Sequence, residues 1–253
     1  MTILKNCYHF RTKCLSMCPP TVRVWAKERA ELSFWRSRHE NEQVLRNDHY
    51  RFFYTDFFKL TDEDYRGYRI LDVGCGPRGS LEWADMALER IGLDPLVDRY
   101  RALGINNHSM GYCHAPVEAI PYESEYFDRV VSFNSLDHVD NLFQALSEIN
   151  RVTKQGGMFL LIVEVNHPPT PTEPVELTEA DLKDKLLETY DVQSWCAYQL
   201  RSDHDIYRSL REGTPQASLE IGEKGIVAAR VIKRAHSRAR ANGNNVLCAA
   251  KGE

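Results

Sequence analysis

Residues 70–79 read ILDVGCGPRG, a short apolar run that carries an acid, Asp72, and then opens into three glycines and a proline. The stretch that follows, LEWADMALERIG at 81–92, has the spacing of a helix. This order favours a site for a nucleotide-like cofactor, because Gly74 and Gly76 have no side chain to keep a ligand from the backbone. A second acid, Asp94, ends the next apolar run 20 residues after Gly74, where it can accept hydrogen bonds from a ribose.

Composition bounds the kind of protein. The chain of 253 residues is long enough for one sizeable core with additions, and 43% hydrophobic with 27% charged residues is ordinary for a globular protein. A net charge of -4 argues against a surface adapted as a whole to nucleic acid. Seven scattered cysteines suit a reducing compartment, and no apolar run is long enough to span a membrane. We therefore expect a cytoplasmic protein.

The first two thirds of the chain divide into two segments. Residues 1–68 predict two helices that form a cap or lid, with Trp25, Leu32 and Trp35 on one buried stripe. From residue 69 the sequence predicts strands at 69–73, 89–94, 127–134 and 157–165, and an amphipathic helix at 141–153. This alternation predicts an α/β fold with a parallel sheet covered on both faces.

The last third begins with a proline-rich loop at 166–177. A helix at 177–190 with Thr178 as its cap and a strand at 191–200 follow, and we expect the closing strand at 245–251. Between these strands, about residues 201–242 predict a mostly helical insertion in a domain that runs from 69 to 253. On a helix, the basic residues of this insertion would form one charged face: Arg230, Lys233, Arg234, Arg238 and Arg240.

Three features occur in a characteristic order: Asp72 before the glycines, FDRVVSFNSLDHV at 127–139, and ALSEINRVTKQGGMFLLIVE at 145–164. In this order and spacing the chain resembles the class I S-adenosylmethionine-dependent methyltransferases, in particular the small-molecule, type 11-like branch, over residues 69–165. The resemblance implies a Rossmann-like, doubly wound, seven-stranded and mostly parallel sheet with an antiparallel C-terminal strand. It also implies S-adenosylmethionine as the cofactor and S-adenosylhomocysteine as the product.

Position by position, the resemblance implies which residues hold the cofactor. The glycine turn passes beneath its methionine part, the acid of the second strand holds its ribose hydroxyls, and residues beyond that acid and near position 117 hold adenine. The end of the fourth strand faces its amino group. The residues so implied are Asp72, Gly74, Cys75, Gly76, Asp94, Pro95, Leu96, Val117, Glu118 and Asn134.

Two positions depart from the family pattern. Arg78 stands where the turn usually has its third glycine, so either the loop path differs or Arg78 reaches a carboxylate. Pro116 stands where the family has an acid that reads the adenine amino group, which leaves backbone near Val117, together with Glu118 or packing, to hold adenine. These departures concern single contacts and leave the class of cofactor unchanged.

The chemistry needs few groups from the protein. A sulfonium methyl is already activated, so alignment of the nucleophile and exclusion of water supply most of the acceleration, and a base is needed only for an acceptor whose proton has a high pKa. His138, Glu164 and His167 follow or end strands, where open parallel sheets bind ligands, and they are the candidate catalytic residues. With Asp137 they are also suitable metal ligands, but their separation in sequence makes a metal site the less favoured interpretation, and we predict none.

The function favoured is methyl transfer to an oxygen or nitrogen of a small metabolite. The partner expected is therefore a small-molecule acceptor, with nucleic acid and membrane disfavoured, and the aromatic N-terminal helices leave oligomerisation open. Three alternatives remain: an RNA or protein methyltransferase that docks through the basic 230–240 segment, a binding module that has lost transfer activity, and a nicotinamide dehydrogenase. The last is least favoured, because it gives no reason for Asp72 or for NSLDHV at 134–139.

Overall fold

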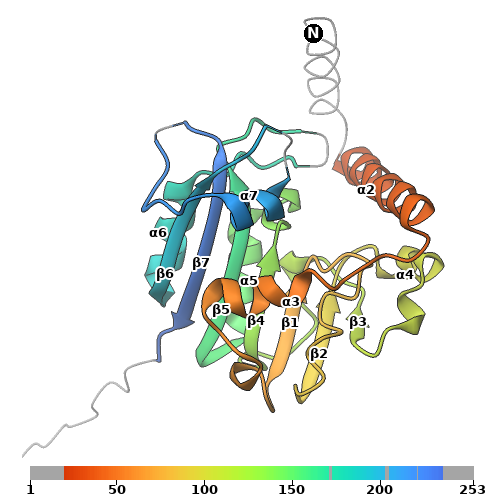
Figure 1. Cartoon of the computed structure of the whole chain (residues 1–253), viewed down its shortest axis with the longest axis horizontal. Coiled ribbons are helices and arrows are strands. Elements are labelled where there is room, and N and C mark those ends of the chain that lie inside the picture. Colours follow the sequence, from red (N-terminus) through yellow and green to blue (C-terminus); the bar gives the residue numbers. More distant parts are fainter. Residues whose placement is uncertain (1–19, 171–172, 203–204, 221, 236–253) are drawn as a thin grey trace, which may run out of the picture.

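The computed structural model describes residues 20–170, 173–202, 205–220 and 222–235. Within them, one seven-stranded sheet has the order β3-β2-β1-β4-β5-β7-β6 (Figure 1). The strands β1 to β5 are parallel, whereas β7 is antiparallel to both β5 and β6. This arrangement confirms the predicted Rossmann-like sheet. The strands are β1 (Arg69–Val73), β2 (Glu89–Leu93), β3 (Gly111–Cys113), β4 (Phe127–Phe133), β5 (Thr153–Val165), β6 (Tyr190–Gln199) and β7 (Gly225–Lys233).

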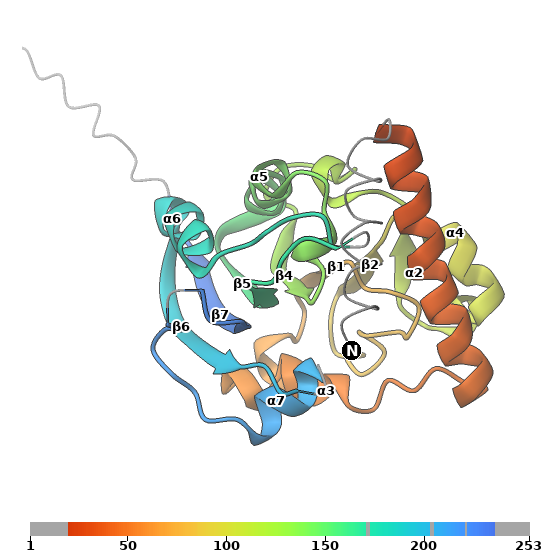
Figure 2. The same cartoon turned by 90° about the horizontal axis from the view of Figure 1, so that it is seen from above.

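Helices cover both faces of the sheet (Figure 2). α5 (Leu142–Val152) and α6 (Glu179–Thr189) lie on one face, and α3 (Tyr50–Tyr54) and α7 (Ile206–Glu212) lie on the other. The inner strand β5 packs against helices on both faces of the sheet. Phe159 packs with α5 and α6, whereas Leu160 packs with α3 and α7. A strand buried on both faces needs an uninterrupted apolar run, which explains why its sequence does not alternate with polar residues. The predicted cap of α6 is also confirmed, since Thr178 forms a capping box with Asp181.

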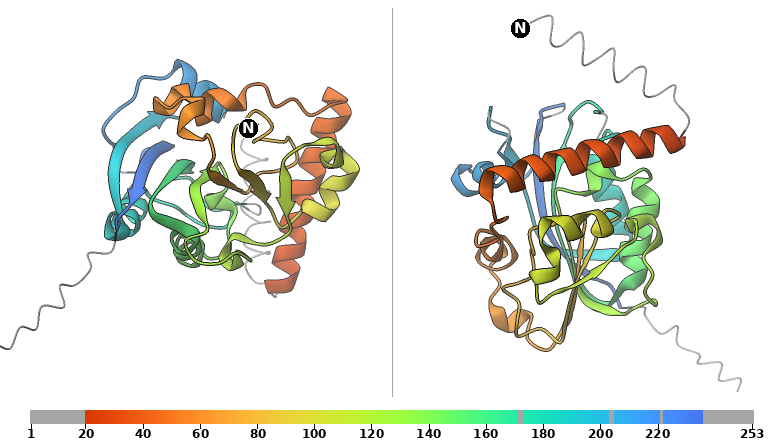
Figure 3. Two further views of the ribbon diagram at one scale, coloured as in Figure 1. Left: turned by 90° about the horizontal axis from the view of Figure 1, so that it is seen from below. Right: turned by 90° about the vertical axis from the view of Figure 1, so that its right-hand side faces the viewer.

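α2 (Pro20–Glu42) belongs to neither layer and runs across the carboxyl ends of the parallel strands, as the right-hand view of Figure 3 shows. It is anchored by Leu32, which is buried in a small cluster with Leu96 and with Tyr100, the last residue of the short helix α4 (Val97–Tyr100). The prediction that Trp25 is also buried is wrong, because 57% of it is exposed. Its ring borders a surface hollow instead, and the guanidinium of Arg29 lies 5.3 Å from the ring centre.

The prediction of a helix at 81–92 is wrong. Residues 80–88 form successive turns, and β2 begins at Glu89. Ile91 is drawn into the sheet opposite Leu71 of β1, so strand pairing overrides the helical spacing. The turns bury Leu81 and Ala84 completely, and Arg90 fixes them by donating hydrogen bonds to the carbonyls of Leu81 and Glu82.

The predicted insertion at 201–242 is also wrong in its main element. Only α7 is helical among the described residues of this segment, and residues 225–233 form β7, the antiparallel strand of the sheet. The β-branched residues of GIVAARVIK favour a strand, and pairing with β5 decides it. The strand expected at 245–251 lies outside the described residues.

The prediction of a basic helical face is also wrong, because residues 225–233 form a strand. Arg230 and Lys233 belong to β7. The Lys233 ammonium is buried and donates to the carbonyls of Asn150 and Thr153, while Arg234 forms an ion pair with Asp191. Arg238 and Arg240 lie outside the described residues. In the part of the chain that the structure describes, no helix is long and apolar enough to cross a membrane.

Candidate cofactor and acceptor site

The glycine loop after β1 is held between its neighbours at the carboxyl edge of the sheet. Gly74 and Gly76 have φ angles of +68° and +57°, and the Gly74 N–H donates to the carbonyl of Leu93 at 2.7 Å. A Cβ atom on Gly74 would overlap Ser135, and one on Gly76 would lie 3.0 Å from the indole of Trp35. The glycines therefore allow close approach as predicted, but the groups that approach them here are protein side chains.

Asp94 lies beside this loop, as the sequence predicts. Its carboxylate accepts hydrogen bonds from the N–H groups of Gly76 at 3.1 Å and Leu96 at 2.8 Å. Burial raises the pKa of Asp94 to about 6. Leu96 is buried, whereas Pro95 is exposed. The loop and the acid thus face one another across a single hydrogen bond, and a carboxylate retains lone pairs for further donors.

Asp72 and Cys75 point into the protein. Asp72 is 2% exposed and accepts hydrogen bonds from the hydroxyls of Tyr54, at 2.9 Å, and Ser80. The Cys75 thiol packs against Gly92 of β2, and burial raises the pKa of this thiol. In these positions Asp72 joins α3 to the loop, and Cys75 can offer a ligand only its backbone.

The pH dependence of stability follows from Asp72, whose pKa burial raises from 3.8 to about 7. A folded state with the higher pKa binds the proton more tightly, so the contribution of Asp72 to stability is greatest below about pH 4 and is lost as the pH rises to about 7. Asp72→Asn removes this titration. We expect the free energy of unfolding of Asp72→Asn, relative to wild type, to increase by at least about 1 kcal/mol across that window in urea titrations. Asp85→Asn, at an exposed acid, should show no such trend, and parallel curves for Asp72→Asn and wild type would contradict the prediction.

The residues predicted for adenine and for the amino group differ in what they offer. The Glu118 carboxylate accepts from the N–H groups of Asp140 and Asn141, so it stabilises the start of α5. Val117 is buried beside it. Asn134, at the end of β4, has a φ of +53°, and its buried Oδ1 accepts no hydrogen bond from any described residue. An unsatisfied buried acceptor is costly, and Asn134 is therefore suited to receive a donor from a ligand.

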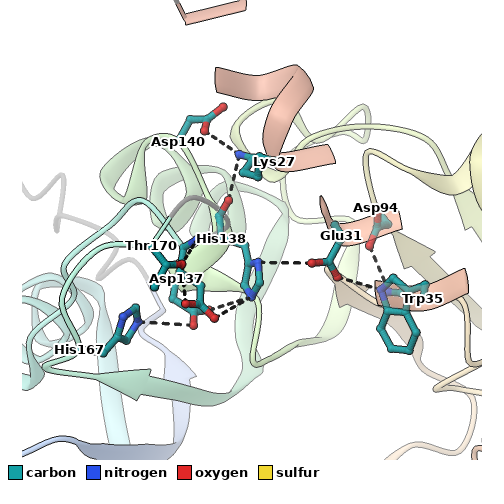
Figure 4. Close-up of polar contacts among 11 residues, drawn as sticks. Lys27, Glu31, Trp35, Asp94, Asp137, His138, Asp140, His167 and Thr170 are labelled. Atoms are coloured by element: carbon teal, nitrogen blue, oxygen red, sulfur yellow. Dashed lines mark hydrogen bonds and ion pairs between the residues drawn. The ribbon is translucent and has the colours of Figure 1, made fainter. Parts of the chain in front are cut away.

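A group of ionisable residues, which we call the acid–histidine cluster, consists of Asp137, His138 and His167, which Figure 4 labels, together with Glu173. Nε2 of His138 lies 3.9 Å from Oδ1 of Asp137 and 4.0 Å from Oε1 of Glu173, and Nε2 of His167 lies 3.7 Å from Oδ2 of Asp137. The cluster thus contains two of the three predicted catalytic residues. The third, Glu164, lies in β5 opposite Ile226 of β7.

The members of the cluster differ in burial. Asp137 and His167 are 1% and 5% exposed. The Asp137 carboxylate, 3.7 Å from Nε2, raises the pKa of His167 to about 9 against the effect of burial. His138 and Glu173 are only half-buried. Glu173 was not predicted, although it follows His167 within the proline-rich loop at 166–177.

α2 connects the cluster to the glycine loop. Glu31 accepts a hydrogen bond from the Trp35 indole at 2.8 Å, and its other oxygen lies 3.9 Å from Nδ1 of His138. Lys27 donates to the His138 carbonyl at 3.0 Å. Figure 4 shows this series from Asp94 past Trp35 and Glu31 to His138. Sequence patterns missed Glu31, because it lies on a helix more than 100 residues before the cluster.

Arg78, in place of the usual third glycine, does reach a carboxylate. Its guanidinium forms a two-pronged ion pair with Glu42 of α2, at 2.6 and 2.7 Å, and also donates to the carbonyl of Arg46. This pairing lowers the pKa of Glu42 to about 2. The guanidinium also lies 5.5 Å from the ring centre of Trp35. The departure from the family pattern therefore fastens α2 to the loop.

Known proteins resemble this chain over the segment that runs from β1 into β5. Residues 71–161 match the methyltransferase domain family. A malonyl-[acyl-carrier protein] O-methyltransferase of Salmonella typhimurium is 37% identical over 93 residues, which are 35% of this chain and 36% of that protein. A ubiquinone/menaquinone biosynthesis C-methyltransferase of Burkholderia multivorans is 29% identical over 161 residues, or 58% and 59% of the two chains.

Among solved structures, an S-adenosylmethionine-dependent methyltransferase of Thermotoga maritima, described as a possible histamine N-methyltransferase, superposes with a TM-score of 0.52. It is 17% identical and covers 79% of this chain and 98% of its own. The fold is thus one that S-adenosylmethionine-dependent methyltransferases share. Residues 71–161 carry the methyltransferase domain, and its cofactor is S-adenosylmethionine, as the sequence predicted. The chain spans about a third to three fifths of the two curated relatives.

Proposed function

We propose that the protein transfers a methyl group from S-adenosylmethionine to an oxygen or nitrogen of a small molecule. The observation that carries this proposal is the placement of the acid–histidine cluster at the same edge of the sheet as the glycine loop and Asp94, with Glu31 and Trp35 of α2 between them. Loop and acid suit the nucleoside, and the cluster suits an acceptor that must lose a proton.

The glycine loop, Asp94 and Asn134 form the nucleoside half of the site, and they have separate tasks in this proposal. Asp94 accepts hydrogen bonds from the ribose hydroxyls, and Oδ1 of Asn134 accepts one from the amino group. When bound, S-adenosylmethionine supplies a sulfonium methyl whose carbon–sulfur bond breaks, with its electron pair going to sulfur, as the acceptor atom bonds to the carbon. Trp35 has to leave the face of Gly76 before a ligand can lie there, so α2 acts as the lid predicted for residues 1–68.

The acid–histidine cluster forms the acceptor half of the site, and it takes up the proton that the acceptor loses. His138 is the best placed of the predicted catalytic residues, because it is half-buried and its two ring nitrogens face the carboxylates of Glu31, Asp137 and Glu173. His167 is buried behind Asp137 and serves to hold that carboxylate. α2 above the site excludes water from the reacting groups.

The acceptor is proposed as a class only. The Salmonella relative is named for an acyl-carrier-protein substrate and the Burkholderia relative for quinone C-methylation, so similar domains serve different acceptors. We favour oxygen or nitrogen because the cluster can receive a proton. Docking of RNA through a basic helix finds no support in the described residues, since Arg230 and Lys233 are in β7. Free thiols at Cys75, Cys113 and Cys196 suit a reducing, cytoplasmic environment.

The test is a transfer assay with methyl-labelled S-adenosylmethionine and fractionated small-molecule extracts. We expect label in a small product, and we expect His138→Gln to lower its formation at least about tenfold while leaving the affinity for S-adenosylhomocysteine unchanged. His114→Gln, at an exposed histidine paired with Asp98 away from the cluster, is the matched control. Binding of the cofactor without labelled product from any extract, or label in RNA or protein only, would refute the proposal.

A further inference from the structure

The acid–histidine cluster holds three donor atoms at a spacing that proton transfer does not require. A ring nitrogen of His138 and one carboxylate oxygen each of Asp137 and Glu173 all lie within 4.8 Å of one another. Separations of 3.9 and 4.0 Å are too long for hydrogen bonds. A point equidistant from the three lies about 2.5 Å or less from each, which is the length of a coordination bond to a divalent cation. We propose that these three atoms bind a divalent metal ion.

The state of Asp137 supports a ligand at this point independently of the spacing. Only 2% of its side chain is exposed, and Oδ1 accepts no hydrogen bond from the residues that the structure describes. A buried carboxylate oxygen without a donor carries a large desolvation cost. This atom is directed toward Nε2 of His138, so a cation among the three donors would satisfy it.

Two of the donor residues have an ionisable neighbour on the side away from the other donors, near enough to approach when an ion binds. Nδ1 of His138 faces Oε2 of Glu31 at 3.9 Å, which leaves Nε2 for the ion. Oδ2 of Asp137 faces Nε2 of His167 at 3.7 Å, which leaves Oδ1. Carboxylates behind ligating histidines fix the ring orientation and the tautomer, and they increase the basicity of the ligand.

The third donor is oriented in the same manner. Oε2 of Glu173 accepts a hydrogen bond from the Thr170 hydroxyl at 2.8 Å, so that Oε1 is the atom nearest His138. Two carboxylates and one imidazole form a mixed set of oxygen and nitrogen donors. Such a set suits Mn²⁺ or Fe²⁺ better than Mg²⁺, which prefers oxygen donors alone. Three protein ligands leave positions on the ion for water and for a substrate atom.

The ion would change how the acceptor is activated, and this consequence rests on the proposed function. An acceptor hydroxyl bound to a divalent cation has a lower pKa, so its proton can leave to solvent water before the oxygen forms its bond to the methyl carbon. His138 then acts on the acceptor as a ligand of the ion and not as the group that receives the proton.

The test uses the full chain after removal of metals with EDTA, titrated with MnCl₂ while the electron paramagnetic resonance signal of free Mn²⁺ is followed. We expect one tight site in wild type. Glu173→Gln should weaken it at least about tenfold, and Glu31→Gln, which removes only the outer partner of His138, should weaken it by up to about tenfold. Glu176→Gln, at an exposed acid three residues from Glu173, should bind Mn²⁺ like wild type.

Thermal melting and cofactor binding complete the design. Mn²⁺ should raise the melting temperature of wild type and Glu176→Gln but not of Glu173→Gln. Glu173 is only partly buried, so this variant keeps the test informative even if Asp137→Asn does not fold. Wild-type affinity in Glu173→Gln, or no binding at about millimolar Mn²⁺, would overturn the metal site. Titration with S-adenosylhomocysteine separates the two proposals. A protein that binds S-adenosylhomocysteine but not Mn²⁺ supports only the methyltransferase, and a protein that binds Mn²⁺ but not S-adenosylhomocysteine supports only the metal site.

Discussion

Gly74→Ala should lower the free energy of unfolding by more than about 3 kcal/mol. An alanine at a φ of +68° costs about 1–2 kcal/mol by itself. Its Cβ would in addition overlap the Ser135 Cβ and lie 2.8 Å from Oγ. Ser135 cannot rotate away freely, because its hydroxyl donates to the Val73 carbonyl and contacts the Ser132 hydroxyl. Urea titration with an intrinsic tryptophan signal measures the loss.

Gly156→Ala is the matched control for this prediction. Gly156 has a φ of +72°, but a Cβ there would meet nothing within 4 Å, so only the backbone cost of about 1–2 kcal/mol remains. Removing the opposing side chain with Ser135→Gly should recover part of the loss in the Gly74→Ala background. Equal costs at Gly74 and Gly156 would show that the loop is not packed against the end of β4 as described.

Asp94→Asn should weaken the binding of S-adenosylhomocysteine by about 100-fold. The change removes the charge and one acceptor oxygen, and two charge-assisted hydrogen bonds to ribose hydroxyls together contribute about 3 kcal/mol. The same oxygens hold the N–H groups of Gly76 and Leu96, so part of the loss reflects a less ordered loop. Calorimetric titration of wild type and variant gives the ratio directly.

Asp98→Asn serves as the comparison, because Asp98 is an exposed acid four residues further on whose partners are Arg101 and His114. It should bind S-adenosylhomocysteine like wild type. A melting curve of Asp94→Asn guards against global unfolding as the cause. Unchanged affinity in a folded Asp94→Asn would remove Asp94 from the nucleoside site.

The sheet was predictable wherever a strand is buried on both faces. The strands at 69–73 and 157–165 are mostly apolar, with the unbroken run MFLLIV at 158–163 in the second, and the glycines after Val73 mark where the first one ends. The prediction failed where two periodicities compete. Leu81 and Ala84 have helical spacing, but β2 begins so soon after them that the chain can only turn. At the C-terminal side, residues 225–233 fall within the predicted helical insertion, but the decisive contact is with β5, far away in sequence.

The candidate site was predictable to the extent that it lies at strand ends. His138 and His167 follow β4 and β5, and parallel strands bring such residues to one edge. Glu31 and Trp35 could not be found this way, because nothing local shows where a helix outside the sheet will lie. The orientation of Asp72 was hidden for a related reason, since its partner Tyr54 comes from a separate helix.

The contact of Trp35 with Gly76 links the two halves of the site thermodynamically. In the proposed function, the indole that has to leave Gly76 before a nucleoside can bind is the hydrogen-bond donor to Glu31, and Glu31 is the group behind His138. Displacing one therefore releases the other. If the proposed function holds, we expect occupancy of either half of the site to alter the affinity of the other half by the same factor, which is reciprocal cooperativity between two ligands within a single subunit.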